Sequence, residues 1–147
     1  MTWAGAPELD ALLARLDRGR AEGAPLASLE RQIEQRYGAS RRLAVYGSLA
    51  PGESNHHVVA PLGGTWRPGW VRGQLLSEGW GSAIGYPGMR WDPAAERVAV
   101  RLLSSTGLPS FWARLDAFEG SDYLRILVPV RNAGDELLAV ANLYAAR

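Results

Sequence analysis

From Arg42 onward the sequence is a succession of short apolar runs with strand character, and only one segment among them has helical spacing. Leu43–Tyr46 form one such run, which Gly47 and Ser48 end. Residues 97–102 alternate between polar or small and apolar side chains, as a half-buried strand does. A parallel sheet needs a crossover, usually a helix, between successive strands. The sequence therefore predicts an α+β fold, in which a mixed or antiparallel sheet curls into a small barrel-like structure and is accompanied by one main helix.

The other strands are expected from the same kinds of pattern. Residues 64–78 hold tryptophan, valine and leucine among glycines, which predicts two extended pieces with a bend. Residues 79–93 are rich in glycine and aromatic side chains and suggest a structured loop. Two final strands are expected near residues 123–131 and 136–145, where a turn at 132–135 would join them in a hairpin.

The first forty residues have a different pattern. Leu9, Leu12, Leu13 and Leu16 form an apolar stripe on one helix, and a second helix with an apolar face is expected to end at Gly38. The sequence is thus divided into a helical extension over residues 1–40 and a main domain over residues 41–147. Two amphipathic helices must cover an apolar surface, and packing on the main domain is favoured over packing on a partner chain.

Composition narrows the classes of function. The 147 residues are 47% hydrophobic and 21% charged, as in a soluble domain with a single core. The 16 basic and 15 acidic residues nearly cancel, which argues against nucleic-acid and membrane partners. No apolar run approaches the roughly 20 residues that cross a bilayer, and no signal-peptide pattern is apparent, so a cytoplasmic location is expected. The chain contains no cysteine, which excludes disulfides, thiolate nucleophiles and cysteine-ligated zinc.

The two histidines are adjacent, and a metal site built on them is not expected. His56 and His57 would face opposite ways in an extended chain, and no third histidine or cysteine could complete a site. A catalytic triad of Ser48, His56 and Asp116 is given little weight, because Ser48 does not lie in a Gly-x-Ser-x-Gly turn. Asn55 and His56 are expected to stabilise their loop by hydrogen bonding.

Three segments together identify a family. The first is Val-Tyr-Gly-Ser-Leu at 45–49 with a following glycine and Asn-His pair; the second is Gly-Tyr-Pro-Gly at 85–88. The third is Leu-Asp-Ala-Phe-Glu-Gly at 115–120, followed by Tyr123 and Arg125. In this order they resemble the gamma-glutamylcyclotransferase-like family over about residues 42–145. The resemblance implies an enzyme that needs no metal or other cofactor. It would cyclise a small gamma-glutamyl substrate to 5-oxoproline and release an amine or amino acid.

Glu119 is the expected catalytic residue. Phe111, Leu115 and Phe118 have helical spacing, and Gly120 is expected to end their helix directly after Glu119. The negative end of a helix disfavours a carboxylate, and the neighbouring Phe118 would desolvate it, so both effects raise its pKa toward neutrality. From residue type alone a solvated surface glutamate is the commoner case. The resemblance assigns Glu119 the role of general acid and base.

The resemblance also suggests residues that hold the substrate. A strand that runs into Gly-Ser leaves backbone amides available to cradle an anion or a polarised carbonyl. Arg125 could pair with a substrate carboxylate or fix Glu119 or Asp116, and structural pairing is favoured; for the aromatic residues, core packing remains the alternative. The expected substrate-binding residues are Tyr46, Gly47, Ser48, Leu49, Tyr86, Tyr123, Arg125 and Tyr144.

The sequence departs from the family pattern in one strand. Many relatives have a glycine and an acidic residue before the helix, where residues 98–103 here read Val-Ala-Val-Arg-Leu-Leu. This difference leaves open a non-catalytic module that retains the family pocket. The identity of the gamma-glutamyl substrate also stays open. So does the role of the N-terminal helices, which could cap the site or mediate assembly, for example as a homodimer.

Overall fold

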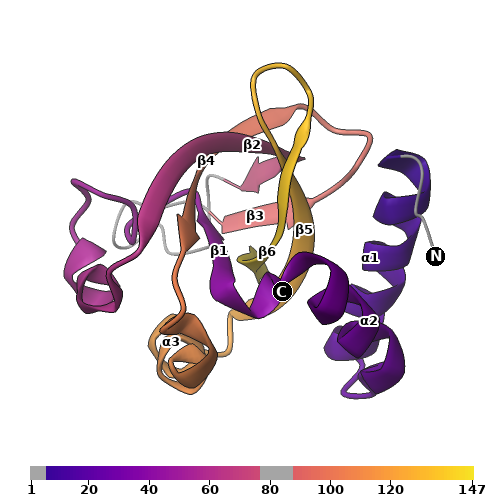
Figure 1. The fold of residues 1–147 in the computed structure, drawn as a ribbon, viewed down its shortest axis with the longest axis horizontal. Helices are drawn as coiled ribbons and strands as arrows, with labels where there is room; N and C mark the ends of the chain where they lie inside the picture. Colours follow the sequence, from indigo (N-terminus) through magenta and orange to yellow (C-terminus); the bar gives the residue numbers. More distant parts are fainter. Residues whose placement is uncertain (1–5, 77–87) are drawn as a thin grey trace.

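A computed structural model describes residues 6–76 and 88–147 of the chain (Figure 1). Helices α1 (Ala6–Ala21) and α2 (Ala27–Tyr37) come first, and helix α3 (Trp112–Glu119) lies between the fourth and fifth strands. Short 3₁₀ turns occupy Ala39–Arg41, His56–Val58, Ala60–Leu62 and Leu108–Ser110. The strands are β1 (Arg42–Val45), β2 (Thr65–Leu76), β3 (Gly88–Trp91), β4 (Arg97–Ser104), β5 (Tyr123–Arg131) and β6 (Leu137–Ala146).

Five of these strands form a barrel. The strand order is β3-β2-β4-β1-β6-β5, and a further pairing of Trp70 in β2 with Arg131 in β5 joins the two sides. β1 runs parallel to β6, whereas the other pairings are antiparallel. β3 is an extra strand outside the closed ring. The predicted α+β fold with a mixed, curled sheet is confirmed, as is the hairpin of β5 and β6.

The segment from residue 64 to residue 93 differs from the sequence-based expectation. β2 is one continuous strand that changes partner: Thr65–Arg72 pair with β4, and Gly73–Leu76 pair with β3. Gly73 lies where the partner changes. A Cβ at this position would lie 2.6 Å from the Arg90 carbonyl oxygen, so the close approach of β3 requires glycine. Part of the expected loop is strand β3, and residues 77–87 lie outside the described residues.

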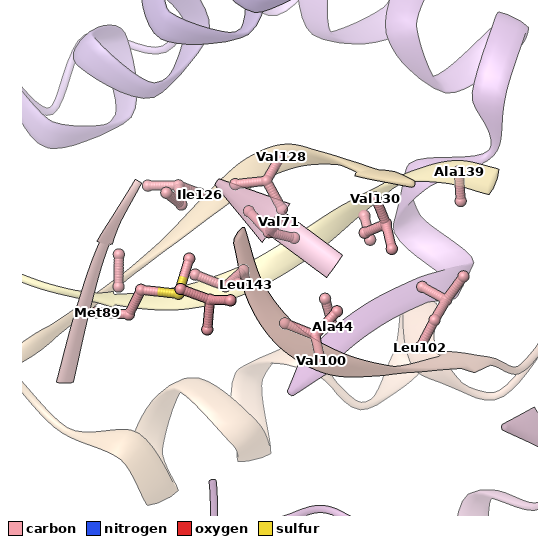
Figure 2. Packing of buried hydrophobic residues seen from close by; sticks show 13 residues of the cluster. Ala44, Val71, Met89, Val100, Leu102, Ile126, Val128, Val130, Ala139 and Leu143 are labelled. Atoms are coloured by element: carbon pink, nitrogen blue, oxygen red, sulfur yellow. The ribbon is translucent and has the colours of Figure 1, made fainter. Parts of the chain in front are cut away.

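The barrel interior is filled by apolar side chains (Figure 2). β4 shows the predicted alternation, since Val98, Val100 and Leu102 are buried in the interior and the residues between them are exposed. The positions of β5 and β6 that face the barrel interior are also valine, isoleucine, leucine or alanine. The interior cluster consists of Ala44, Val71, Met89, Val98, Val100, Leu102, Ile126, Val128, Val130, Ala139, Ala141, Leu143 and Ala145.

The N-terminal helices pack on the outside of the same barrel (Figure 1). In α1, Leu9, Leu13 and Leu16 are buried and Leu12 is partly buried. They pack with Ile33 of α2, Leu127 of β5 and Val140 of β6. Gly38 ends α2 in a left-handed conformation, with φ of 61°, and its amide donates to the Glu34 carbonyl at 2.8 Å. The helices therefore cover the protein's own apolar surface, as favoured. No helix in residues 6–76 and 88–147 has the length and apolar character needed to cross a membrane.

Candidate active site

Glu119 is the last residue of α3, where the sequence placed it. Gly120 follows with φ of 81°, and its amide donates to the Asp116 carbonyl at 3.0 Å. This backbone conformation suits glycine and turns the chain from α3 toward β5. The Glu119 side chain is half-buried rather than directed into open solvent.

Three tyrosines lie within electrostatic reach of the Glu119 carboxyl group. Tyr46 follows β1, Tyr123 begins β5, and Tyr144 lies near the end of β6. Burial raises the pKa of each tyrosine, and the negative charge of Glu119 raises it further. The fold thus brings four of the expected site residues together from four separate segments.

Desolvation makes Glu119 a candidate for proton transfer. Burial raises the pKa of Glu119 from 4.5 to about 7. The raised pKa agrees with the predicted desolvation, and the side chain of the neighbouring Phe118 is 43% exposed.

Asp116, one helical turn earlier, has the opposite environment. It accepts hydrogen bonds from Tyr144 Oη at 2.6 Å and from Arg125 Nε at 2.9 Å. Burial alone would raise its pKa, but these hydrogen bonds and the Arg125 charge lower it overall. Two carboxyl groups whose pKa values are pushed apart are typical of sites in which one stays ionised and the other exchanges protons.

The loop after β1 is held by its carbonyl groups and side chains. The Gly47 carbonyl accepts from the Ala50 amide at 3.1 Å, and the Ser48 carbonyl accepts from the Asn55 amide at 2.9 Å. Asn55 Nδ2 also donates to Ser48 Oγ at 3.0 Å, and His56 Nδ1 lies 2.9 Å from the Leu49 carbonyl oxygen. Within the described part of the chain, the amides of residues 47–49 donate no main-chain hydrogen bond. The loop is therefore fixed through its carbonyl groups and side chains.

Tyr46 connects this loop to the last strand. Its hydroxyl donates to the Tyr144 carbonyl at 2.7 Å. This hydrogen bond fixes the turn after β1 against the end of β6. The expected stabilising role of Asn55 and His56 is confirmed by their bonds. The Ser48 hydroxyl is bonded to Asn55 and the His56 ring to the Leu49 carbonyl, so these bonds do not form a Ser-His pair.

Other expected residues have different outcomes. The Arg125 guanidinium pairs with Asp116, the structural alternative that the sequence favoured, and also donates to Asn142 Oδ1 at 3.1 Å. The Leu49 side chain is buried in the apolar cluster under α3, so only its main chain is available. Tyr86 lies outside the described residues. No group of three or more His, Asp or Glu side chains suited to a metal ion occurs in the ranges 6–76 and 88–147.

Sequence reasoning missed two polar residues beside the site. Asn142 is 1% exposed, and its Oδ1 accepts from both Arg125 Nη1 and Arg20 Nη1 at 3.1 Å. A lone asparagine in the apolar run of β6 was a usable signal, because a buried amide needs partners. Nothing in the pattern of α1 distinguished Arg20 from the other arginines of that helix.

A groove of about 650 Å³ lies beside these residues. Tyr123, Tyr144, Asp116 and Arg125 line one part of it, and Arg20 of α1 lines another. The N-terminal helices therefore contribute to the surface next to the candidate site.

Comparison with known proteins gives a family and a fold. Residues 43–147 match the model of the family described as gamma-glutamyl cyclotransferase, AIG2-like. The chain resembles the structure of the uncharacterised protein PH0828 from Pyrococcus horikoshii, with 20% identity, coverage of 71% of this chain and 76% of that one, and a TM-score of 0.54. It also resembles c4763, a uropathogenic E. coli-specific protein, with 23% identity, coverage of 71% and 78%, and a TM-score of 0.52.

The solution structure of At3g28950.1 from Arabidopsis thaliana shares the fold as well, with 18% identity, coverage of 72% of this chain and 61% of that one, and a TM-score of 0.54. No curated protein matches the chain. At these identities the solved structures establish the fold, and the family model confirms the resemblance that the three sequence segments indicated.

Proposed function

Because the chain belongs to the gamma-glutamyl cyclotransferase, AIG2-like family, we propose that it cyclises a gamma-glutamyl group to 5-oxoproline and releases an amine or amino acid. Glu119 acts as general base and then as general acid. The observation that carries this proposal is the half-buried Glu119 side chain at the end of α3, where burial raises its pKa to about 7 within electrostatic reach of Tyr46, Tyr123 and Tyr144.

The reaction needs few groups from the protein, because the nucleophile is already part of the substrate. Glu119 takes a proton from the substrate's alpha-ammonium group, and the free amine attacks the gamma-carbonyl carbon. A C–N bond forms and closes a five-membered ring. The C–N bond to the leaving group then breaks as its nitrogen takes the proton from Glu119, and the ring nitrogen gives up its second proton to solvent. The products are a neutral lactam ring and a free amine. Intramolecular reactions of well-oriented groups reach effective molarities on the order of 10⁵ M or more.

A carboxyl group with a pKa of about 7 suits both proton transfers. At neutral pH such a group is divided between its two forms, so accepting and returning a proton have similar free energies. A carboxyl group at the ordinary pKa would be too weak a base for an ammonium group. The burial of Glu119 thus supplies the property that the reaction needs.

The loop after β1 is the proposed site of oxyanion stabilisation. The amides of Gly47, Ser48 and Leu49 follow Tyr46, which is one of the three tyrosines around Glu119. Backbone donors aimed at a developing negative charge contribute about 3 kcal/mol each to transition-state stabilisation. A substrate folded between this loop and Glu119 would place its carbonyl oxygen on the amides and its ammonium group at the carboxylate.

Turnover of a panel of gamma-glutamyl peptides and amines, measured as 5-oxoproline, tests the proposal. We expect Glu119→Gln to reduce kcat by at least about a hundredfold, because the amide cannot transfer the protons. Asp122→Asn is the matched control, since it removes an exposed carboxyl group three residues away and should retain activity. Near-normal turnover in the Gln variant would remove Glu119 from the mechanism.

The panel also separates an enzyme from a binding module. If folded wild-type protein forms no 5-oxoproline from any compound, the cyclotransferase proposal is wrong. Calorimetric binding of an intact gamma-glutamyl compound by the same preparation would then support the non-catalytic alternative that the unusual strand at residues 98–103 left open.

A further inference from the structure

The N-terminal extension reaches the candidate site through Arg20. This residue lies in the last turn of α1 and precedes residues 43–147, the part that matches the family model. Its Nε and Nη2 atoms donate to the Glu30 carboxylate of α2, with a shortest distance of 2.7 Å. Its Nη1 atom donates to Asn142 Oδ1 and to the Arg125 carbonyl, both at 3.1 Å. One guanidinium thus joins both helices to β5 and β6.

Asn142 passes this connection to Arg125. Its Oδ1 is shared by the two arginines, and its Nδ2 donates to the Ala39 carbonyl at 2.9 Å, so the buried amide cannot turn without losing bonds. The Arg125 guanidinium also lies over the Trp112 ring, with 4.5 Å between its Cζ atom and the ring centroid. Asn142 and the Trp112 ring therefore hold the Arg125 guanidinium while it donates to Asp116.

Asp116 is the point at which the network meets the site. It accepts from Arg125 and from the Tyr144 hydroxyl, and Tyr144 also accepts from Tyr46 through its carbonyl group. Glu119 lies one helical turn from Asp116 and within electrostatic reach of both tyrosines. A displacement of Arg125 would thus move Asp116 and the Tyr144 hydroxyl beside the proposed acid and base.

We propose that Arg20 is a positioning residue: through Asn142 and Arg125 it fixes Asp116 and the Tyr144 hydroxyl in the geometry that Glu119 requires. This inference rests on the proposed function for its effect on turnover, whereas the contacts that carry it do not depend on the reaction. It assigns the N-terminal helices a part in completing the site.

Electrostatics agree with these contacts. Burial would raise the pKa of Asp116, but the hydrogen bonds from Arg125 and Tyr144 and the charges of Arg125 and Arg20 together lower it. The Arg20 charge therefore acts on Asp116 although the two side chains share no hydrogen bond among those of the described residues.

The test compares Arg20→Met with Arg18→Met. Both remove one positive charge from the last turn of α1, but Arg18 is exposed and outside the network. We expect kcat for 5-oxoproline formation to fall about tenfold in Arg20→Met, the scale of one lost hydrogen bond to a charged group, and to stay unchanged in Arg18→Met. Equal kcat values in the two variants would overturn the proposal.

A double-mutant cycle tests the route. Arg20→Met combined with Tyr144→Phe should lose about as much kcat as Tyr144→Phe alone, because the two changes interrupt one chain of contacts. If the loss of kcat in the double variant equals the product of the two single losses, Arg20 does not act through Tyr144.

Arg20→Lys separates position from charge and serves if Arg20→Met fails to fold. Lysine keeps the charge but cannot donate to Glu30 and Asn142 from opposite sides of one planar group. We expect kcat to stay low in this variant. Recovery of the wild-type kcat would show that Arg20 acts through its charge and not by positioning.

The pKa of Asp116, measured by NMR of its carboxyl carbon, distinguishes this inference from the proposed function. It should rise in Arg20→Met and stay unchanged in Arg18→Met. An unchanged value in Arg20→Met would overturn the inference even in an active enzyme. A raised value in a protein without turnover would support the network and count against the proposed function alone.

Discussion

At the scale of single residues, the molecule keeps carboxyl groups in environments that differ within one helical turn. Asp116 is exposed and paired with Arg125, whereas Glu119 is half-buried among tyrosines. The first arrangement favours the ionised form, and the second favours the neutral form. The sequence places both residues on α3 and predicts the raised pKa of Glu119, whereas the lowered pKa of Asp116 depends on Arg125 and Tyr144, which the fold brings to it from β5 and β6.

The pH profile follows from Glu119. A general base works in its ionised form, and a carboxyl group is ionised above its pKa, so we expect kcat/KM to rise with pH through an inflection near 7. Initial rates of 5-oxoproline formation between pH 5 and 9 measure this profile. A flat profile over that range would contradict the assignment of Glu119 as base.

Asp17 of α1 predicts a pH dependence of stability that is separate from activity. Its Oδ1 accepts from the Leu127 amide at 2.8 Å, whereas its buried Oδ2 has no hydrogen-bond partner within the described chain. Burial raises its pKa from 3.8 to about 7. Between these values the folded state retains a proton that the unfolded state has released, so the free energy of unfolding falls as pH rises, by up to about 4 kcal/mol from this group.

We expect Asp17→Asn to make this fall smaller, because the amide has no proton to lose in this range. Urea unfolding at pH 5 and pH 8 measures the difference, and Glu22→Gln, at an exposed position of the same segment, is the control. An identical pH dependence in wild type and Asp17→Asn would show that Asp17 is ionised in the folded protein across the range.

At the scale of elements, the helices were predictable and their polar contacts were not. The leucine stripe of α1 and the glycine after α2 set their positions in the sequence, because periodicity and left-handed glycine are local properties. Arg20 bonds to atoms that lie 105 and 122 positions away, and no local pattern encodes such a contact. The continuous course of β2 was missed for the same reason, since its change of partner depends on β3 and β4.

Leu13 should carry much of the attachment of α1 to the barrel. Its side chain is completely buried, whereas that of Leu12 in the same helix is only partly buried. We expect Leu13→Ala to lower the free energy of unfolding by about 2–5 kcal/mol, the range for a leucine cavity, and Leu12→Ala to lower it less. Denaturant unfolding of both variants checks this, and equal losses would show that α1 does not pack on the barrel through Leu13.

At the scale of the whole molecule, closure of the barrel depends on a close approach of β2 and β5. Gly69 precedes Trp70, which pairs with Arg131, and a Cβ at Gly69 would lie 2.7 Å from Val130 Cγ1. The sequence indicated a curled sheet from the scarcity of helices. It could not show where the ring closes, because the closing contact joins two strands that are distant along the chain.

Gly69→Ala therefore tests the closure. We expect a loss of about 1–3 kcal/mol in the free energy of unfolding, as for an extra methyl group in a filled space. Gly134→Ala in the turn before β6 is the matched control, because a Cβ there meets atoms only at ordinary contact distance, 3.4 Å or more. If Gly69→Ala lowers the free energy of unfolding no more than the control does, the close approach of β2 and β5 at Gly69 is not needed for stability.

The candidate site was predictable as a set of residue types and unpredictable as an arrangement. The motif around Glu119 and the Tyr-Gly-Ser-Leu segment indicated the family, and the fold places Tyr46, Tyr123, Tyr144 and Glu119 together. The sequence offered a structural pairing of Arg125 with Glu119 or Asp116, but the choice of Asp116 depends on how α3 is rotated against the barrel. The spacing of three apolar residues does not specify that rotation.

The parallel pairing of Leu43 with Asn142 has a consequence during synthesis. A ribosome adds about 5–20 residues per second, so β1 leaves it several seconds before β6 is available. During that interval one edge of β1 lacks its neighbour, and the nascent chain exposes apolar surface that later lines the barrel. The turn after β1 acquires its anchor on β6 only when translation has passed Tyr144, so the site cannot be completed before β6 has been made.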